Sequence, residues 1–170
     1  MPVTPFHFGP GLLIKAAAPR RFSFAAYAAA QVVIDVESGY NILFDRWPFH
    51  RLMHTFVIGS AAGAAAGIAV GVFGARVLAA HAALRKPIAA SEIALVPATV
   101  GGLVGGALHV LLDGIQHEDM HPFWPFSDAN PLLGIASLGV LELGCVVTGV
   151  IGIAILARRL RRDRRGQLLE

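Results

Sequence analysis

The fold of this chain is indicated most clearly by residues 56–80, which read Phe56-Val-Ile-Gly-Ser-Ala-Ala-Gly-Ala-Ala-Ala-Gly-Ile-Ala-Val-Gly-Val-Phe-Gly-Ala-Arg-Val-Leu-Ala-Ala80. Arg76, near the end of this run, is its one charged residue. A helix of about 20 apolar residues is long enough to cross a hydrocarbon core of about 30 Å. The run therefore predicts a transmembrane helix.

Two further runs are long enough to cross a membrane. Leu132–Ala157 has Glu142 as its one charged residue, and Ile93–Leu112 is apolar with Pro97 near its start. A proline at such a position is tolerated when neighbouring helices satisfy the freed backbone groups. We expect an all-α, multi-pass transmembrane bundle with about three full spans.

The N-terminal region contains two shorter apolar runs, Phe8–Ala18 and Phe22–Val36, separated by Pro19-Arg20-Arg21. The first run would form a helix of roughly 16 Å, which is too short to cross the membrane. The pattern predicts a helical hairpin with its basic turn at the cytoplasmic face and with a first arm that is re-entrant or partly buried in protein.

The composition supports a membrane protein, since 55% of the residues are hydrophobic and 15% are charged, against a usual charged share of about 25%. We divide the chain into one membrane-embedded domain, residues 1–157, and a basic tail, residues 158–170. The arginines of the tail favour a cytoplasmic anchor near anionic lipid over nucleic-acid binding. The single cysteine, Cys145, excludes a disulfide framework and a thiolate metal site.

Charged residues separate into two sets of helix ends. The basic set comprises Lys15, Arg20, Arg21, Arg76, Arg85, Lys86 and the tail, and the acidic set comprises Asp35, Glu37, Asp45, Glu118, Asp119 and Asp128. Because short cytoplasmic loops are enriched in lysine and arginine, we expect the basic ends in the cytoplasm and the acidic ends facing the periplasm, in a bacterial inner membrane. The unusual N-terminal hairpin leaves the inverted orientation open. The aromatic residues Trp47, Phe49, Trp124 and Phe126 lie at the acidic ends, as an interfacial belt would.

Four glycines, Gly59, Gly63, Gly67 and Gly71, recur at every fourth position of the first predicted span. Small residues at this spacing let two helices approach closely. The ridge predicts packing inside the bundle or, as the alternative, a homodimer.

The strongest functional motif is His109-Val-Leu-Leu-Asp113-Gly-Ile-Gln-His117. Residues four apart lie on one face of a helix, so two imidazoles and a carboxylate would form one stripe beside the membrane. Ionisable groups are costly there unless they bind something. Imidazole with carboxylate suits zinc, or manganese and iron in mixed oxygen–nitrogen sites.

Other candidate ligands are expected at the same face of the bundle. They are His7, Asp35, Glu37 and the pair His50 and His54, which are four residues apart. This set is larger than one ion requires. We therefore expect one or two metal ions, with Asp113 as the natural bridge between two.

Several residues keep two interpretations. His121 is a ligand or the cap of a turn, Glu37 is a supporting group or general base or else a solvated acid, and Arg51 holds an anionic substrate oxygen or pairs with a nearby carboxylate. Glu142, inside a span, faces a partner or a cavity. His81 lies at the basic ends and is excluded from the site.

Taken together, the motifs resemble a known family. They are Thr4-Pro-Phe-His-Phe-Gly-Pro-Gly11, His50-Arg51-x-x-His54-Thr55, the His109/Asp113/His117 stripe, and His117-Glu-Asp-Met-His-Pro-Phe-Trp-Pro-Phe-Ser127. In combination they look like the LexA-regulated, inner-membrane-associated metal-dependent hydrolases of bacteria (YdjM-like). The resemblance implies a hydrolase and no particular substrate.

The order of the motifs is also similar, more distantly, to the all-α zinc-dependent phospholipase C and P1 nuclease group. That similarity implies a phosphoester hydrolase with His7, Asp35, His54, His109, Asp113 and His117 as ligands, and His50 as an alternative or addition to His54. The chain lacks the N-terminal tryptophan ligand of that group, and Leu138 stands four residues before Glu142 where a histidine is expected. One or two ions are therefore expected in place of three.

We expect a membrane-bound hydrolase of a phosphoester or lipid-type substrate that uses a metal-activated water. Arg51 would hold the anionic oxygen, and Asp35 or Glu37 would handle protons. A divalent metal or proton transporter is the main alternative, since the same ligands would form a transport site. A haem protein and a scaffold with a structural metal are further alternatives.

Overall fold

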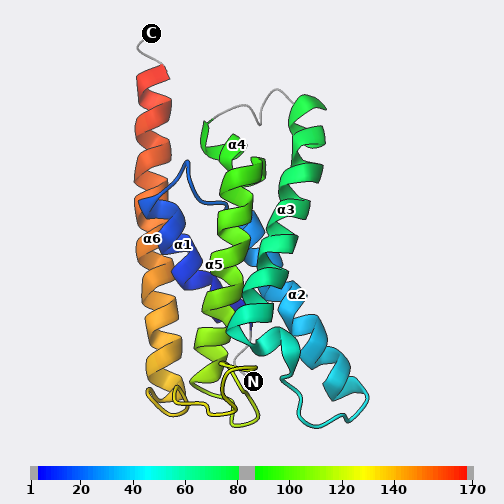
Figure 1. Cartoon of the computed structure of the whole chain (residues 1–170). Helices are drawn as coiled ribbons and strands as arrows, with labels where there is room; N and C mark the ends of the chain where they lie inside the picture. The colour runs from blue at the N-terminus through cyan, green and yellow to red at the C-terminus, as the bar shows by residue number, and fades with distance from the viewer. Residues whose placement is uncertain (1–3, 81–86, 168–170) are drawn as a thin grey trace.

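The computed structural model describes residues 4–80 and 87–167, and in this part of the chain it is all-helical, without strands. The predicted fold class is confirmed (Figure 1). The elements, in order, are η1 (Thr4–His7), α1 (Phe8–Ala17), α2 (Phe24–Leu43), η2 (Leu52–His54), α3 (Phe56–Ala80), α4 (Pro87–Ile93), α5 (Leu95–Gly114) and α6 (Leu138–Gln167).

Three helices are long and apolar enough to cross a membrane, namely Phe56–Arg76, Leu95–Gly114 and Leu138–Arg162. Their number agrees with the sequence prediction, but two boundaries differ. The span expected from Ile93 is divided at Ala94, whose extended backbone separates α4 from α5. The last span begins at Leu138 and not at Leu132, because the chain between them turns through Gly134, which has a positive φ of 74°.

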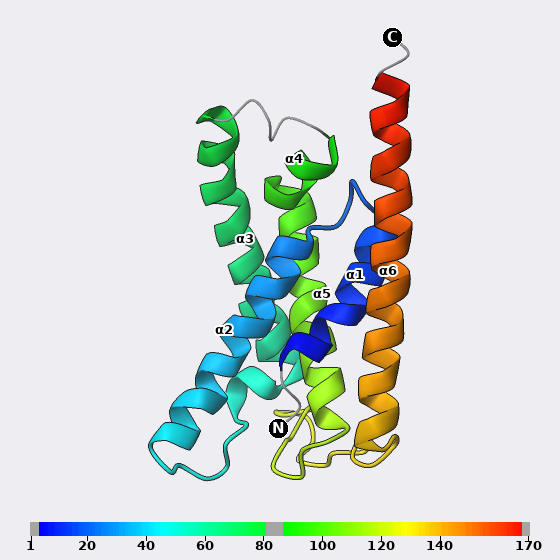
Figure 2. The ribbon, with the colours of Figure 1, turned by 180° about the vertical axis from the view of Figure 1, so that it is seen from behind.

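The N-terminal region forms the two expected helices, joined at Pro19-Arg20-Arg21, and α2 extends seven residues beyond the predicted Val36 to Leu43. Helix α1 packs mainly against α6 and crosses it obliquely (Figure 2). A Cβ atom on Gly152 would lie 2.6 Å from the carbonyl carbon of Leu12, so the two helices are in backbone contact. This contact explains how a helix too short to cross the membrane is held inside the bundle.

The most extensive helix pair is α3 with α5, and glycines form its interface. A Cβ on Gly63 would overlap the carbonyl oxygen of Gly102, and a Cβ on Gly106 would overlap that of Gly59. The glycine ridge of α3 is thus in contact with α5 of the same chain. The structure therefore favours packing within the bundle over a homodimer through this ridge.

The two ends of the bundle differ as the charge pattern predicts. The exposed residues Arg20, Arg21 and Arg76 lie at one end, together with the C-terminal part of α6, which projects beyond the other helices (Figure 1). The C-terminus of α5 and the loops before α3 and α6 lie at the other end, together with the start of η1. His81, Arg85 and Lys86 fall outside the described residues. The three apolar helices support membrane association.

Helix α2 carries a polar stripe along its buried face. Ser23 Oγ donates to the backbone oxygen of Glu92 (2.7 Å), Tyr27 Oη to that of His7 (2.7 Å), and Gln31 Nε2 to that of Gly105 (2.9 Å). Each polar group therefore joins α2 to a different element, namely α4, η1 and α5.

Lys15 is buried at the basic end of the bundle, where the sequence predicted a cytoplasmic charge. Its Nζ donates to the backbone oxygen of Phe22 and to Ser91 Oγ, both at 2.8 Å, and forms an ion pair with Glu92. Ser91 Oγ in turn donates to the backbone oxygen of Pro19 (2.7 Å). This network holds α1, the basic turn and α4 together.

Candidate metal centre

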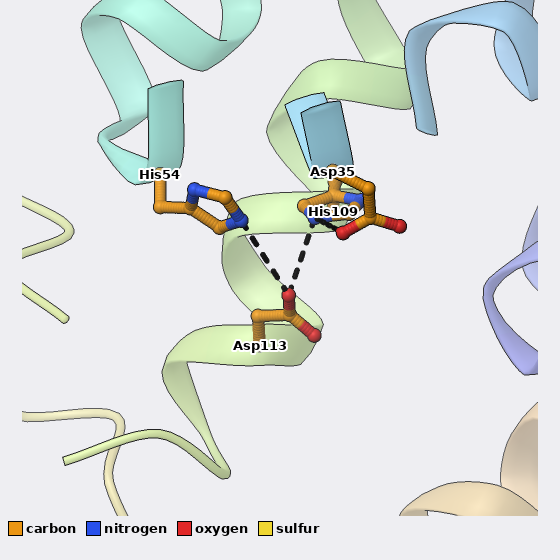
Figure 3. A group of neighbouring side chains, drawn as sticks. All are labelled: Asp35, His54, His109 and Asp113. Atoms are coloured by element: carbon orange, nitrogen blue, oxygen red, sulfur yellow. Dashed lines mark ion pairs between the residues drawn. The ribbon is translucent and has the colours of Figure 1, made fainter. Parts of the chain in front are cut away.

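Asp113, in the last turn of α5, is the centre of the histidine cluster and is 4% exposed. Three imidazoles surround its carboxylate (Figure 3 shows two of them). His109 Nε2 lies 3.2 Å and His54 Nε2 3.9 Å from Oδ2, and His7 Nε2 lies 3.3 Å from Oδ1. These side chains come from α5, η2 and η1.

The structure brings together two groups of side chains that could each hold a metal ion. The first is Asp35, His54, His109 and Asp113, and the second is His50, Asp113 and His117, with the ligand atoms of each group within 4.8 Å of one another. Asp113 belongs to both groups, as expected of a bridging carboxylate. His7 adjoins the first group through Asp113, and its ring centroid lies 5.1 Å from that of His109.

Several polar atoms at the cluster are buried without a hydrogen-bond partner. Among the described residues these atoms are His7 Nδ1 and Nε2, His54 Nε2, His109 Nε2 and Asp113 Oδ1. Buried polar groups are normally hydrogen-bonded, because an unsatisfied one costs roughly 1–3 kcal/mol. Since all five atoms lie around one carboxylate and all are metal-ligand types, the residues fit a divalent cation.

The other nitrogen of three imidazoles is held by a side-chain oxygen. His109 Nδ1 lies 2.8 Å from Gln31 Oε1, His50 Nδ1 2.9 Å from Asp119 Oδ1, and His54 Nδ1 3.3 Å from Glu37 Oε2. Carboxylate and carboxamide oxygens accept here, so Nδ1 carries the proton and Nε2 keeps its lone pair. Metal-ligating histidines commonly show this arrangement, which fixes the tautomer and the ring orientation.

The backbone reaches this arrangement differently from the prediction. His50 and His54 were expected on one helical face, but η2 is a 3₁₀ turn of Leu52–His54 and His50 precedes it in a non-helical segment. Their rings nevertheless meet, with centroids 4.7 Å apart. The α-helical stripe was wrong for His117, which lies beyond the end of α5, although its N–H still donates to the backbone oxygen of Asp113 (2.9 Å) and its ring lies 4.1 Å from that of His50.

The electrostatics favour ligand protonation states in the second group. Burial lowers the pKa of His117, and the neighbouring His50 lowers it further, so the imidazole is neutral at pH 7. Burial alone would raise the pKa of Asp119, but hydrogen bonds from the His50 amide and ring lower it below its usual range. Asp119 is therefore ionised and acts as the acceptor for His50.

An open cavity of about 580 Å³ adjoins the second group. Its lining residues are Ile42, Trp47, Phe49, His50, Gln116, His117, Glu118, Asp119 and Leu133. It thus combines aromatic and aliphatic walls with the two histidines of the second group, and it gives a small molecule access to that side of the cluster.

Three candidates from the sequence lie outside the cluster. The exposed Arg51 donates from Nε to the backbone oxygen of Pro48 (3.0 Å) and from Nη2 to that of Trp47 (2.9 Å). His121 is exposed and its Nδ1 lies 2.5 Å from the backbone oxygen of Asp128, so it closes a turn. Glu142 is half-buried in α6 and belongs to neither ligand group.

Sequence reasoning missed two residues of the cluster, Gln31 and Asp119. Gln31 is a single polar residue in the apolar run before Asp35 and lies four positions from it, which was a usable signal. Asp119 was recognised only as one of several acids in a loop. Its contact with His50 spans 69 positions in the sequence, and local spacing does not reveal it.

Comparisons with protein-family models, curated proteins and solved structures found no match for the chain. The functional argument therefore rests on the geometry of the cluster and its position in the bundle.

Proposed function

We propose that this protein is a membrane-bound, metal-dependent hydrolase. The observation that supports the proposal is the set of five buried, partnerless nitrogen and oxygen atoms around Asp113, beside an open cavity. A buried cluster that served only to hold the fold together would pair these atoms with one another or with backbone groups.

Asp35, His54, His109 and Asp113 would hold one ion, with His7 beside them, and His50, Asp113 and His117 would hold a second. We propose zinc, with manganese or iron as the other metals that such ligands suit. A divalent ion supplies Lewis-acid activation of a water molecule and of a substrate oxygen when it is bound.

The chain's own residues would perform the remaining tasks. Asp35, whose side chain is 30% exposed at the edge of the buried group, is the carboxylate best placed to exchange protons with solvent. The cavity walls from Trp47, Phe49, Ile42 and Leu133 would exclude water from one side of the substrate. Arg51 is directed to loop carbonyls, so its proposed contact with an anionic oxygen requires a change in side-chain conformation.

The substrate class that fits this position is a phosphoester or lipid-type molecule. The cluster lies near the end of a transmembrane helix, where head groups are found, and its cavity is partly apolar. We further propose the bacterial inner membrane, with the cluster facing the periplasm and the C-terminus in the cytoplasm, from the distribution of arginine and lysine. Membership of the YdjM-like hydrolases is part of the same proposal.

The first test is elemental analysis of detergent-purified protein, with the Asp113→Ala variant beside wild type. We expect one or two zinc, manganese or iron ions per chain in wild type and a metal content near zero in the variant, since Asp113 belongs to both ligand groups. Wild-type protein should then hydrolyse bis-p-nitrophenyl phosphate or phospholipids in vesicles, and Asp113→Ala should not.

Two results would contradict the proposal. Wild-type protein that remains metal-free after incubation with each of the three metals would exclude a metal-dependent activity. Metal-loaded protein that hydrolyses no ester but carries zinc or protons across liposome membranes would support the transport alternative.

A further inference from the structure

The segment from Phe49 to His54 carries two histidines of the cluster but contains no α-helix to organise it. Asp119, in the loop after α5, holds the first half of this segment. Its Oδ2 accepts from the backbone N–H of Phe49 (2.8 Å) and of His50 (3.0 Å), and its Oδ1 lies 2.9 Å from His50 Nδ1. One carboxylate thus fixes both the backbone and the ring of His50.

Glu37, near the end of α2, holds the second half in the same manner. Its Oε2 accepts from the backbone N–H of Arg51 (3.3 Å) and of Met53 (2.9 Å), and it lies 3.3 Å from His54 Nδ1. Each carboxylate therefore binds two backbone amides and one imidazole of the same short segment, from opposite sides.

Both carboxylates are largely withdrawn from solvent, with side-chain exposures of 5% for Asp119 and 17% for Glu37. Both acidic groups also have a pKa below the usual range, because hydrogen bonds from the segment outweigh the effect of burial. A carboxylate that already accepts three hydrogen bonds in a fixed direction is poorly suited to collect a proton from a water molecule.

We propose that Glu37 and Asp119 form a pair of positioning residues that orient His54 and His50 through the Nδ1 atoms and direct both Nε2 atoms at Asp113. The inference rests on the proposed metal site and deepens it. It assigns Glu37 a positioning role in place of general base catalysis, and it gives Asp119 a role that the sequence did not indicate.

The test compares Asp119→Asn and Glu37→Gln, which preserve side-chain shape but replace one acceptor oxygen by a donor NH₂ group. The direct measurement is the ¹⁵N chemical shift of both ring nitrogens of His50 and His54 in metal-free protein, which reports the tautomer. In wild type we expect protonated Nδ1 and unprotonated Nε2 on both rings. Asp119→Asn should change this pattern at His50 alone, and Glu37→Gln at His54 alone.

The second measurement is zinc affinity, by competition with a chromophoric chelator. Each variant should bind zinc about 10- to 100-fold more weakly, which is the usual effect of removing a group that supports a metal ligand. Asp45→Asn is the matched control, because it removes a negative charge from an exposed position in the same loop, and its φ of 50° is tolerated by asparagine. Its affinity and ring shifts should equal those of wild type.

The inference is overturned if both variants keep the wild-type tautomers, or if either one alters both rings equally, as a general loss of structure would. It is also overturned if both variants bind zinc as tightly as wild type. If wild-type protein binds no metal, the hydrolase proposal fails, while the ring shifts of the metal-free protein still decide whether the two carboxylates set the tautomers.

Discussion

The two ends of the bundle both bury polar side chains but satisfy them differently. At the basic end Lys15 is bonded to a backbone oxygen, a serine hydroxyl and a carboxylate, all within the chain. At the other end, nitrogen and oxygen atoms of His7, His54, His109 and Asp113 are buried with no hydrogen-bond partner. Burial of charge alone therefore does not indicate a binding site. Incomplete pairing among ligand-type atoms does.

The largest expected effect concerns the complete network. Lys15→Met removes the cation and leaves Glu92 and two acceptor oxygens without their donor, so it should lower the free energy of unfolding by about 3 kcal/mol, near the lower limit for breaking a buried pair because Glu92 is partly exposed. Denaturant unfolding in detergent measures this change. Arg20→Met, at an exposed position, is the control and should stay within about 0.5 kcal/mol of wild type. Equal stability of the two variants would mean that the Lys15 network is not structural.

The incomplete cluster should respond to metal instead. Zinc at 100 times its dissociation constant should stabilise wild-type protein by about 2.7 kcal/mol, because it binds the folded chain and not the unfolded one. Asp113→Ala should lose this increment and Lys15→Met should retain it, although the latter starts from a lower stability. A zinc increment that survives in Asp113→Ala would separate metal binding from the cluster.

A smaller effect, and a different sign, is expected for a histidine of the cluster. His7→Leu removes two partnerless buried nitrogens, so the metal-free variant should be as stable as wild type within about 1 kcal/mol, or more stable. Gln31→Leu is the contrast, since it removes hydrogen bonds to Gly105 and His109 and should destabilise the same metal-free protein. Thermal unfolding of both variants checks the pair. Substantial destabilisation by His7→Leu would show that His7 has a partner within the fold.

The smallest effect concerns pH. Burial and the nearby His50 lower the pKa of His117, so the folded chain binds this proton less tightly than the unfolded chain does. The stability of metal-free protein should therefore decrease as the pH falls below about 6.5, the ordinary pKa of histidine. His117→Gln should show a shallower decrease between pH 7 and pH 5 in thermal unfolding. A steeper decrease in the variant would reverse the predicted sign.

The spacing of apolar runs was sufficient to predict the bundle and the number of spans, because helices in a membrane must be long, apolar and internally hydrogen-bonded. It was also sufficient for His109 and Asp113, which share a helical face. It was less accurate at helix ends, where Pro131 and Gly134 delay α6 and where His117 leaves the helix. At such positions turns and loop contacts replace helical periodicity.

The contacts that complete each end of the bundle were outside the reach of local spacing. Lys15 bonds to Ser91, 76 positions away, and His109 to Gln31, 78 positions away. The sequence marks such residues only as polar exceptions in apolar runs. Which exceptions meet depends on how the helices pack, and here that is decided by backbone contacts between glycines.

Those glycine contacts also limit how the protein can change shape. With no side chain between Gly63 and Gly102, or between Gly59 and Gly106, α3 and α5 cannot slide past each other without a backbone collision. An alternating-access cycle would have to leave this pair intact and rock α1, α2 or α6 around it. The pair is the fixed frame of the molecule, and any opening and closing during turnover falls to the loops before α3 and α6.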